Sequence, residues 1–483
     1  MTDRALRILI TLSVVFIIPA IAQKGWAADL ENTVRAARTY LQTEDPKEKA
    51  RIAKNDLAKF DGDWAEVIAA FRAEEYPTVA PGYYPGEHFS DPELQKKHPD
   101  DLLFIQVPSA YDPAQPAGLI VFMHGGGSDS PRTAPDRYML AADAGTSKRS
   151  TRLGDVFETA GMIGVGPSAP WNEKDSSRWC LPEADDYLAD VIRECKQRFH
   201  IDDDRVFLMG HSMGGFGAWH QVQRQPDRFA AVIGSAGMWS FAHWPAIRGT
   251  TFCIVHGARD AERGVRDRHT DIAYARWGHR LLEQHGIPHV FKEHPDGHSF
   301  GYGKSKVLEF LKASRDLRRD PAFPHVVLVS PVGYKSSRSF PARHNRWVTL
   351  EAAREGTVEY DALQREGPGH RKDSSVEDWS QWRLVHETVK RNGARIEAIN
   401  EGNNRFRVTT LNVAGFTLWL NEAMVDFDAD IQVMVDGKVL FAGRLKPSLT
   451  TLLDSYRRRG DWGLVYPAKV TIDLKEWSRK LGK

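Results

Sequence analysis

Between residues 102 and 314, uniformly apolar stretches alternate with stretches in which apolar residues recur every three or four positions. The first kind is typical of strands in a sheet that is covered on both faces, and the second of amphipathic helices. The strands are expected at 102–107, 118–123, 162–165, 206–209, 229–233, 251–255 and 290–292, and the main helices at 185–199, 271–285 and 304–314. This alternation predicts an α/β domain with a mostly parallel central sheet over residues 101–320.

Beyond residue 320 the pattern changes to short runs in which apolar and polar residues alternate. These runs lie at 395–399, 405–409, 415–420, 431–435 and 438–442. Asp436-Gly437 separates the last two and favours a tight hairpin turn, because both positions tolerate a positive φ. The sequence therefore predicts a smaller, β-rich accessory domain over 321–483, with an exposed loop at 367–376.

The N-terminus has the pattern of a secretory signal. Arg4 and Arg7 precede an apolar run from Ile8 to Ala22, which is shorter than the 20 or so residues of a membrane span. We expect residues 1–28 to be a signal peptide cleaved near Ala22 or Ala27, and the mature protein to be periplasmic or secreted without a membrane association. Residues 29–100 are expected to form short helices followed by an irregular connection.

The charge balance argues against a nucleic-acid partner, and the cysteine content argues against a disulfide framework. The chain has 65 Lys and Arg residues against 64 Asp and Glu residues, so no net field favours nucleic acid. Cys180, Cys195 and Cys253 do not form a disulfide framework in this pattern and are expected to be buried thiols.

The sequence Gly210-His211-Ser212-Met213-Gly214 lies between a predicted strand and a predicted helix. A sharp turn that holds a serine hydroxyl clear of its own backbone needs small residues two positions before and after the serine. Ser212 is therefore the candidate nucleophile.

A serine hydroxyl needs a base and an acid that orients the base, and in this arrangement they follow the serine in the order acid, histidine. Asp260 comes just after the predicted strand 251–255 and is the candidate acid, with Glu262 and Asp267 as substitutes. For the base we favour His298 over His294, because Gly297 frees its loop while Pro295 stiffens the alternative.

Backbone amides are expected to bind the oxyanion. One belongs to Met213, directly after the nucleophile, and the other to Gly125 or Gly126 in the turn His124-Gly125-Gly126-Gly127. Trp171 and Trp179 are candidates for the wall of a substrate pocket, with ordinary core packing as the alternative. The tryptophans of the C-terminal region are expected mainly in its core rather than on a binding face; they are Trp347, Trp379, Trp382 and Trp419.

Together these motifs resemble the α/β-hydrolase superfamily over about residues 102–317. More narrowly, Tyr111-Asp112-Pro113, the turn at 124–127, the serine motif and the turn from His256 to Asp260 resemble the secreted esterases grouped with polyhydroxybutyrate depolymerases and feruloyl esterases. The resemblance implies hydrolysis of carboxylic esters through an acyl-enzyme, with no metal or organic cofactor.

We therefore expect an exported serine hydrolase that acts on a small or polymeric ester. Two alternatives stay open. One is a serine peptidase of the prolyl oligopeptidase type, and the other is a protein that binds a polymer or a partner and keeps a hydrolase-like core. The C-terminal domain is also a candidate surface for oligomerisation.

Overall fold

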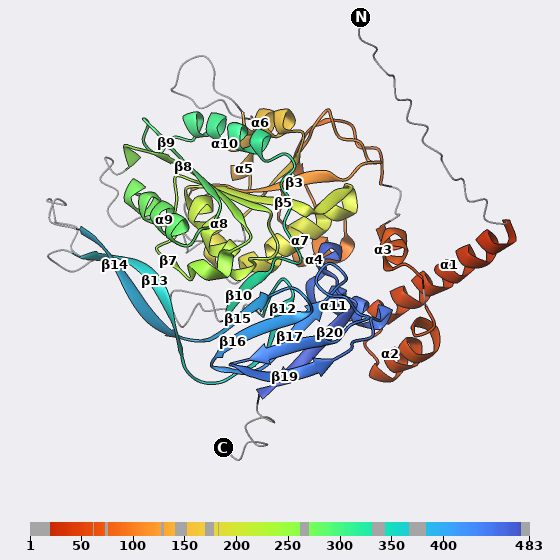
Figure 1. Ribbon diagram of the computed structural model, residues 1–483. Coiled ribbons are helices and arrows are strands. Elements are labelled where there is room, and N and C mark those ends of the chain that lie inside the picture. Colours follow the sequence, from red (N-terminus) through yellow and green to blue (C-terminus); the bar gives the residue numbers. More distant parts are fainter. Residues whose placement is uncertain are drawn as a thin grey trace, which may run out of the picture.

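The computed structural model describes residues 20–60, 62–72, 76–126, 130–140, 152–169, 178–181, 183–260, 270–330, 343–366 and 383–474 (Figure 1). An eight-stranded sheet forms its centre, and six adjacent strands of this sheet, from β4 to β9, run parallel. In spatial order the strands are β1 (Gly82–Glu87), β2 (Leu103–Val107), β4 (Ile163–Pro167), β3 (Ala117–Met123), β5 (Ile201–His211), β6 (Ala231–Ser235), β8 (Thr251–Gly257) and β9 (His289–His294). This confirms the predicted α/β fold class.

Helices cover both faces of the central sheet. The cluster of buried residues on one face takes its side chains from α7 (Glu183–Arg198), α8 (Met213–Arg224) and α9 (Ile272–Gln284), together with the short α4 (Pro92–Lys97). The cluster on the other face takes them from α5 (Ala134–Leu140), α6 (Leu153–Ala160) and α10 (Gly301–Ala313). Because both faces are covered, the strands carry continuous apolar runs, as their sequences indicated.

The C-terminal region is a sandwich of two sheets with an added helix. One sheet has the order β10 (His325–Ser330), β15 (Ala394–Asn400), β16 (Arg405–Leu411), β18 (Ile431–Val435) and β19 (Lys438–Gly443). The other has the order β11 (His344–Asn345), β12 (Val348–Ala353), β17 (Val413–Leu420) and β20 (Ala468–Asp473). Side chains from both sheets share one buried cluster, which includes Trp347 and Trp419 as expected. Trp379 and Trp382 lie outside the described residues.

The hairpin between β18 and β19 turns at Asp436-Gly437, whose φ angles are 47° and 79°. Both values lie in the left-handed region, so the predicted tight turn is confirmed. The exposed loop predicted at 367–376 lies outside the described residues.

The N-terminal helices pack against the C-terminal region. Side chains of α1 (Ala20–Gln42), α2 (Pro46–Ile52), the following π-helical turn (Ala53–Leu57) and α3 (Trp64–Arg72) share a buried cluster with α11 (Leu449–Arg459). The hydroxyl of Tyr40 donates a hydrogen bond of 2.8 Å to Asp454 on α11. Helices are therefore present as expected, but α1 has 23 residues, is longer than predicted and begins within residues 1–28. These helices connect the two ends of the chain.

A long hairpin also joins the C-terminal region to the central domain. It consists of β13 (Thr357–Glu366) and β14 (Arg383–Asn392), and β13 pairs antiparallel with the two-residue strand β7 (Phe241–Ala242). The ring of Phe241 stacks on that of Tyr360 at 4.6 Å. Figure 1 shows this hairpin reaching along the side of the central domain toward α9.

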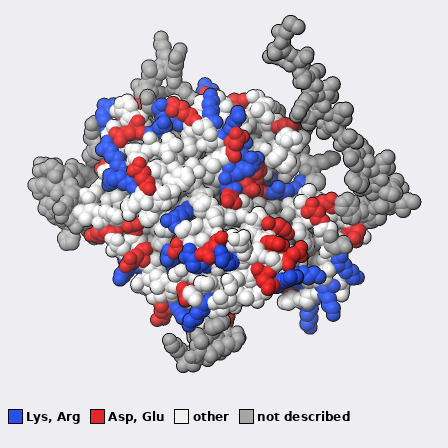
Figure 2. Space-filling model, in the orientation of Figure 1, with Lys and Arg blue, Asp and Glu red and all other residues white. Residues whose placement is uncertain are grey.

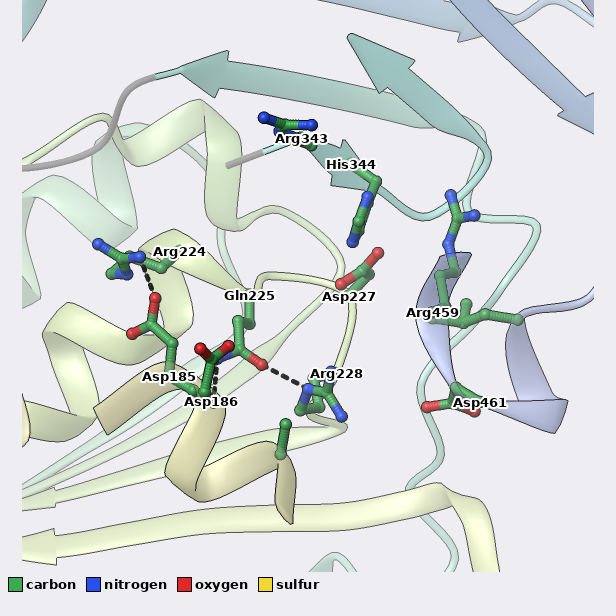
Figure 3. Close-up of a pocket in the computed structure, with 12 residues that line it drawn as sticks. Asp185, Asp186, Arg224, Gln225, Asp227, Arg228, Arg343, His344, Arg459 and Asp461 are labelled. Atoms are coloured by element: carbon green, nitrogen blue, oxygen red, sulfur yellow. Dashed lines mark hydrogen bonds and ion pairs between the residues drawn. The ribbon is translucent and has the colours of Figure 1, made fainter. Parts of the chain in front are cut away.

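Charged residues line the junction where α7, α8 and the end of α11 meet. A cavity of about 230 Å³ lies there, lined by Asp185 and Asp186 of α7, Arg224 of α8, Arg459 at the end of α11 and Asp461 just after it (Figure 3). Deeper in the same junction, Arg319 donates hydrogen bonds to Asp461 at 2.6 and 2.9 Å and to Asp204 at 2.7 Å. On the face seen in Figure 2 the surface charges of both signs are interspersed, in line with the balanced composition.

Replacing Asp461 by Asn is expected to lower the free energy of unfolding at pH 7 by about 3 kcal/mol, because the buried guanidinium of Arg319 keeps only Asp204 as a charged partner. Although burial opposes ionisation, the charges of Arg319 and Lys196 lower the pKa of Asp461 far below its usual range. A depressed pKa stabilises the fold above the unfolded value of about 3.9, and the stabilisation is lost progressively as the pH falls from there toward the folded pKa. Urea unfolding at pH 7 and pH 3 measures both effects.

The exposed Asp316, replaced by Asn, is the matched control for this prediction. If D461N and D316N unfold at the same urea concentration at pH 7, the buried ion pair does not hold the two regions together.

The edge of the central sheet differs from the sequence expectation. The stretch 82–87 was expected to be irregular, but it forms the edge strand β1, in which Pro85 and Gly86 fall at a register shift. An edge strand tolerates proline because one side of its backbone is unpaired.

The three cysteines are buried and free, as expected. Among the described helices, none is long and apolar enough to cross a membrane.

Candidate active site

Ser212 lies in a sharp turn between β5 and α8. Its φ and ψ angles are 56° and −115°, a strained conformation for a residue with a side chain. A Cβ atom on Gly210 would overlap the backbone of Gly214, and one on Gly214 would overlap the carbonyl of Met123. The two glycines of the motif are therefore required by close backbone contacts, and the turn projects the serine from the end of the strand.

Three predicted side chains form one hydrogen-bonded chain. The Nε2 atom of His298 lies 2.8 Å from the hydroxyl of Ser212, and its Nδ1 atom lies 2.9 and 3.1 Å from the two carboxylate oxygens of Asp260. The three residues follow β5, β8 and β9, so they meet at the carboxyl edge of the parallel strands. An ionised Asp260 accepts a hydrogen bond from the N–H group at Nδ1, which leaves the lone pair of Nε2 free to accept a hydrogen bond from the hydroxyl of Ser212.

Asp260 is almost completely buried, with 1% of its surface exposed. Burial opposes its ionisation, but hydrogen bonds from His256 and His298 outweigh this effect and lower the pKa of Asp260. The carboxylate is therefore ionised at neutral pH, as an orienting acid must be. Its substitutes Glu262 and Asp267 lie outside the described residues.

His294, the alternative base, and His211, the neighbour of Ser212, make other contacts. His294 is buried at the end of β9, where its carbonyl accepts a hydrogen bond of 2.7 Å from Ala258, and it does not take the position beside Ser212 that His298 takes. His211 is stacked on Phe300 at 4.7 Å, and its Nδ1 lies 3.2 Å from the hydroxyl of Ser235. Burial and then the neighbouring His298 lower the pKa of His211, so its ring is neutral.

The turn at 124–126 lies directly beside the serine. A Cβ atom on Gly125 would come within 2.9 Å of the Cβ of Ser212, so only a glycine backbone fits so closely. Gly126 has a φ of 118°, which again favours glycine. Gly127 lies outside the described residues. The structure thus brings Gly125 next to Ser212, and Gly126 follows it in the same turn.

Trp179 does not line a substrate pocket. Its side chain is fully buried, and its indole N–H donates a hydrogen bond of 3.0 Å to the carbonyl of His124. A side chain without exposed surface cannot contact a substrate, so this tryptophan instead supports the turn that carries Gly125. Trp171, the other candidate, lies outside the described residues.

A family model described as "Serine aminopeptidase, S33" matches residues 159–257 of the chain. This match covers β4 to β8 and includes the turn that carries Ser212. The central domain of the chain has the α/β-hydrolase fold.

Two curated relatives are similar to parts of this hydrolase. A bifunctional acetylxylan esterase/xylanase of Neocallimastix patriciarum is 24% identical over 160 residues, which are 33% of the hydrolase and 21% of that protein. A dipeptidyl-peptidase 5 of Porphyromonas gingivalis is 34% identical over 80 residues, 17% of the hydrolase and 11% of the peptidase. The matched parts thus span about a fifth and a tenth of the length of these relatives.

Solved structures include esterases with a similar arrangement. A ferulic acid esterase is 16% identical and covers 49% of the hydrolase and 99% of its own chain, with a TM-score of 0.37. The feruloyl esterase module of Clostridium thermocellum is 14% identical and covers 50% and 88%, with a TM-score of 0.33.

One residue of the site was not assigned a role from the sequence. His256 is fully buried, and its Nε2 lies 3.1 Å from Asp260 and 2.6 Å from the carbonyl of Thr270. The carbonyl can only accept, so Nε2 carries a proton that is shared with the carboxylate. His256 therefore positions Asp260. The signal was its place at the end of a predicted strand four residues before the acid, but its partner Thr270 is distant in sequence.

Replacing His256 by Ala is expected to lower the turnover number of the hydrolase by about 10- to 100-fold, an effect typical of outer hydrogen-bond partners. The Michaelis constant is expected to change little, because His256 has no surface from which to touch a substrate. Steady-state kinetics on an activated ester measures the two constants separately. A variant with the full turnover number would show that Asp260 keeps its place without this histidine.

Proposed function

We propose that this hydrolase cleaves carboxylic esters through an acyl-enzyme. The observation that carries the proposal is the unbroken chain of hydrogen bonds from Ser212 through His298 to Asp260. Ser212 attacks the carbonyl carbon while His298 takes its proton, and the tetrahedral intermediate collapses as His298 protonates the leaving alcohol. Water then attacks the acyl group with the same assistance, which releases the acid and restores the serine.

The oxyanion of each tetrahedral intermediate is assigned to backbone amides. In this proposal the donors are the amide of Met213, directly after Ser212, and that of Gly125 or Gly126, because Gly125 lies against Ser212 with no side chain between them. No metal or organic cofactor takes part in this sequence of steps.

A panel of substrates tests the reaction class. p-Nitrophenyl esters of increasing acyl length, methyl ferulate and acetylated xylan are compared with peptide p-nitroanilides under identical conditions. We expect a kcat/KM for the esters that exceeds that for the peptide substrates by orders of magnitude. The opposite ranking would assign the protein to the peptidases, the second candidate, which is supported by the family match and by the dipeptidyl-peptidase relative.

We also propose that the hydrolase is exported. Two arginines followed by an apolar run at the N-terminus support this proposal. In the full chain the two expected cleavage sites lie within the helix α1, residues 20–42. N-terminal sequencing of the protein recovered from the periplasm or the medium tests the proposal. We expect a mature chain that begins shortly after Ala22 or Ala27. Recovery of the uncleaved chain in the cytoplasm alone would contradict export.

A further inference from the structure

Three metal-ligating side chains meet at the opposite end of the sheet from Ser212. His279 and Glu283 lie one turn apart on α9, and His289 is the first residue of the edge strand β9. One candidate ligand atom from each residue lies within 4.8 Å of those of the other two. The turn that brings them together includes Gly286, whose φ of 63° allows the chain to reverse after the helix.

The hydrogen bonds of the cluster fix the tautomers of both histidines. The Nδ1 atom of His289 lies 2.8 Å from the carbonyl of Ile287, which can only accept, so Nδ1 carries the proton. The Nε2 atom of a neutral His289 is then a lone-pair donor held in a fixed direction. It lies 2.8 Å from Nδ1 of His279, which must donate to it. A backbone carbonyl that holds the far nitrogen of a histidine is typical of metal ligands.

Two acceptors face each other when His279 is neutral. If it donates through Nδ1, its Nε2 atom carries only a lone pair, and the nearest carboxylate oxygen of Glu283 lies 3.6 Å away. The two acceptors repel each other unless Nε2 carries a proton, as it does when His279 is charged or when a metal ion takes the place of the proton on Nδ1. The ring of His279 is held by stacking on Phe291 at 4.8 Å, which fixes the position of this ligand.

We propose that His279, Glu283 and His289 bind a divalent transition metal such as Zn²⁺. Two imidazoles and one carboxylate suit Zn²⁺, Ni²⁺ or Cu²⁺ rather than Mg²⁺ or Ca²⁺, which prefer oxygen ligands. Tetrahedral ligands at about 2.0–2.1 Å from the metal are about 3.3 Å apart, so metal binding replaces the hydrogen bond between the two histidines by a small rotation of the rings. The proton on Nδ1 of His279 is released and its Nε2 takes up a proton, so the ring stays neutral. The metal clamps α9 to β9 and has no part in the chemistry at Ser212.

Zinc titration of the untagged full chain, after treatment with a chelator, tests the site. Isothermal titration calorimetry is expected to show one Zn²⁺ bound with micromolar affinity. Zn²⁺ is also expected to raise the thermal midpoint by a few degrees, while Mg²⁺ leaves it unchanged. The variants Glu283→Gln and His289→Ala are expected to bind Zn²⁺ about 10-fold more weakly or worse.

His386→Ala is the matched control, because His386 is also a partly exposed histidine paired with a carboxylate, that of Asp361. It is expected to bind Zn²⁺ as the parent does. Glu283 is largely exposed, so its replacement leaves the fold intact and decides the test if His289→Ala is unstable in the chelator. Absence of binding to the parent, or equal binding by Glu283→Gln and the parent, would overturn the proposal. Ester hydrolysis in the chelator stays at its original rate in either case.

Discussion

Replacement of Ser212 by Ala is expected to lower the turnover number for esters by about 10⁶-fold, because it removes the atom that forms the acyl-enzyme in the proposed mechanism. The loss of the hydroxyl leaves His298 and the proposed oxyanion site in place, so substrate binding is expected to change little. Part of the backbone strain at φ 56° remains in the variant, and the fold is expected to persist. Single-turnover kinetics with a p-nitrophenyl ester, together with a thermal melt, separates lost chemistry from lost structure.

Ser314, at the far end of α10, provides the matched control, since S314A removes the same atom at a distance from the site. Its turnover is expected to equal that of the parent protein. Residual activity of S212A within about 100-fold of the parent would mean that another group attacks the ester, far short of the loss expected for a nucleophile.

The second large effect is expected for Asp260→Asn, with a loss of about 10⁴-fold in turnover. The amide group of Asn can donate to Nδ1 of His298, and this moves the imidazole proton to Nε2. Nε2 then points a hydrogen instead of a lone pair at Ser212, although it still lies at hydrogen-bond distance. The base is therefore present in the wrong tautomer. The pH dependence of kcat/KM in the variant measures this change.

Asp296→Asn is the control for this substitution, because Asp296 lies in the loop after β9 that carries His298 and is partly exposed in an ion pair with Arg259. Its activity is expected to stay within about 2-fold of the parent, as surface ion pairs contribute little. Equal activities of D260N and D296N would show that the carboxylate at 260 does not orient the histidine.

Much of the central domain could be predicted because the residues that indicate each element lie next to each other in the sequence. The apolar runs that become buried strands and the glycines around Ser212 are contiguous in the sequence. The order of serine, acid and histidine follows from the parallel sheet, since each residue comes after a strand that ends at the same edge. The choice of His298 over His294 rested on the freedom of Gly297 and the stiffness of Pro295, and the structure places His298 beside Ser212.

What the sequence did not indicate depends on contacts between distant residues. Trp179 was a candidate for the pocket wall, but its side chain is fully buried. Its indole N–H is bonded to the carbonyl of His124, which is 55 residues away in the sequence. The support of Asp260 by His256 requires the carbonyl of Thr270, and the packing of the N-terminal helices requires α11 near the other end of the chain. The spacing of apolar residues shows which face of a helix or strand is buried, but not which other element packs against that face.

Labelling with a fluorophosphonate probe tests the central claim most directly, because such probes react with serines activated by a neighbouring base. We expect one equivalent of probe per chain, located by peptide mass spectrometry on Ser212, and complete loss of labelling in the variant His298→Ala. Labelling of a different serine, or unchanged labelling without His298, would contradict the account.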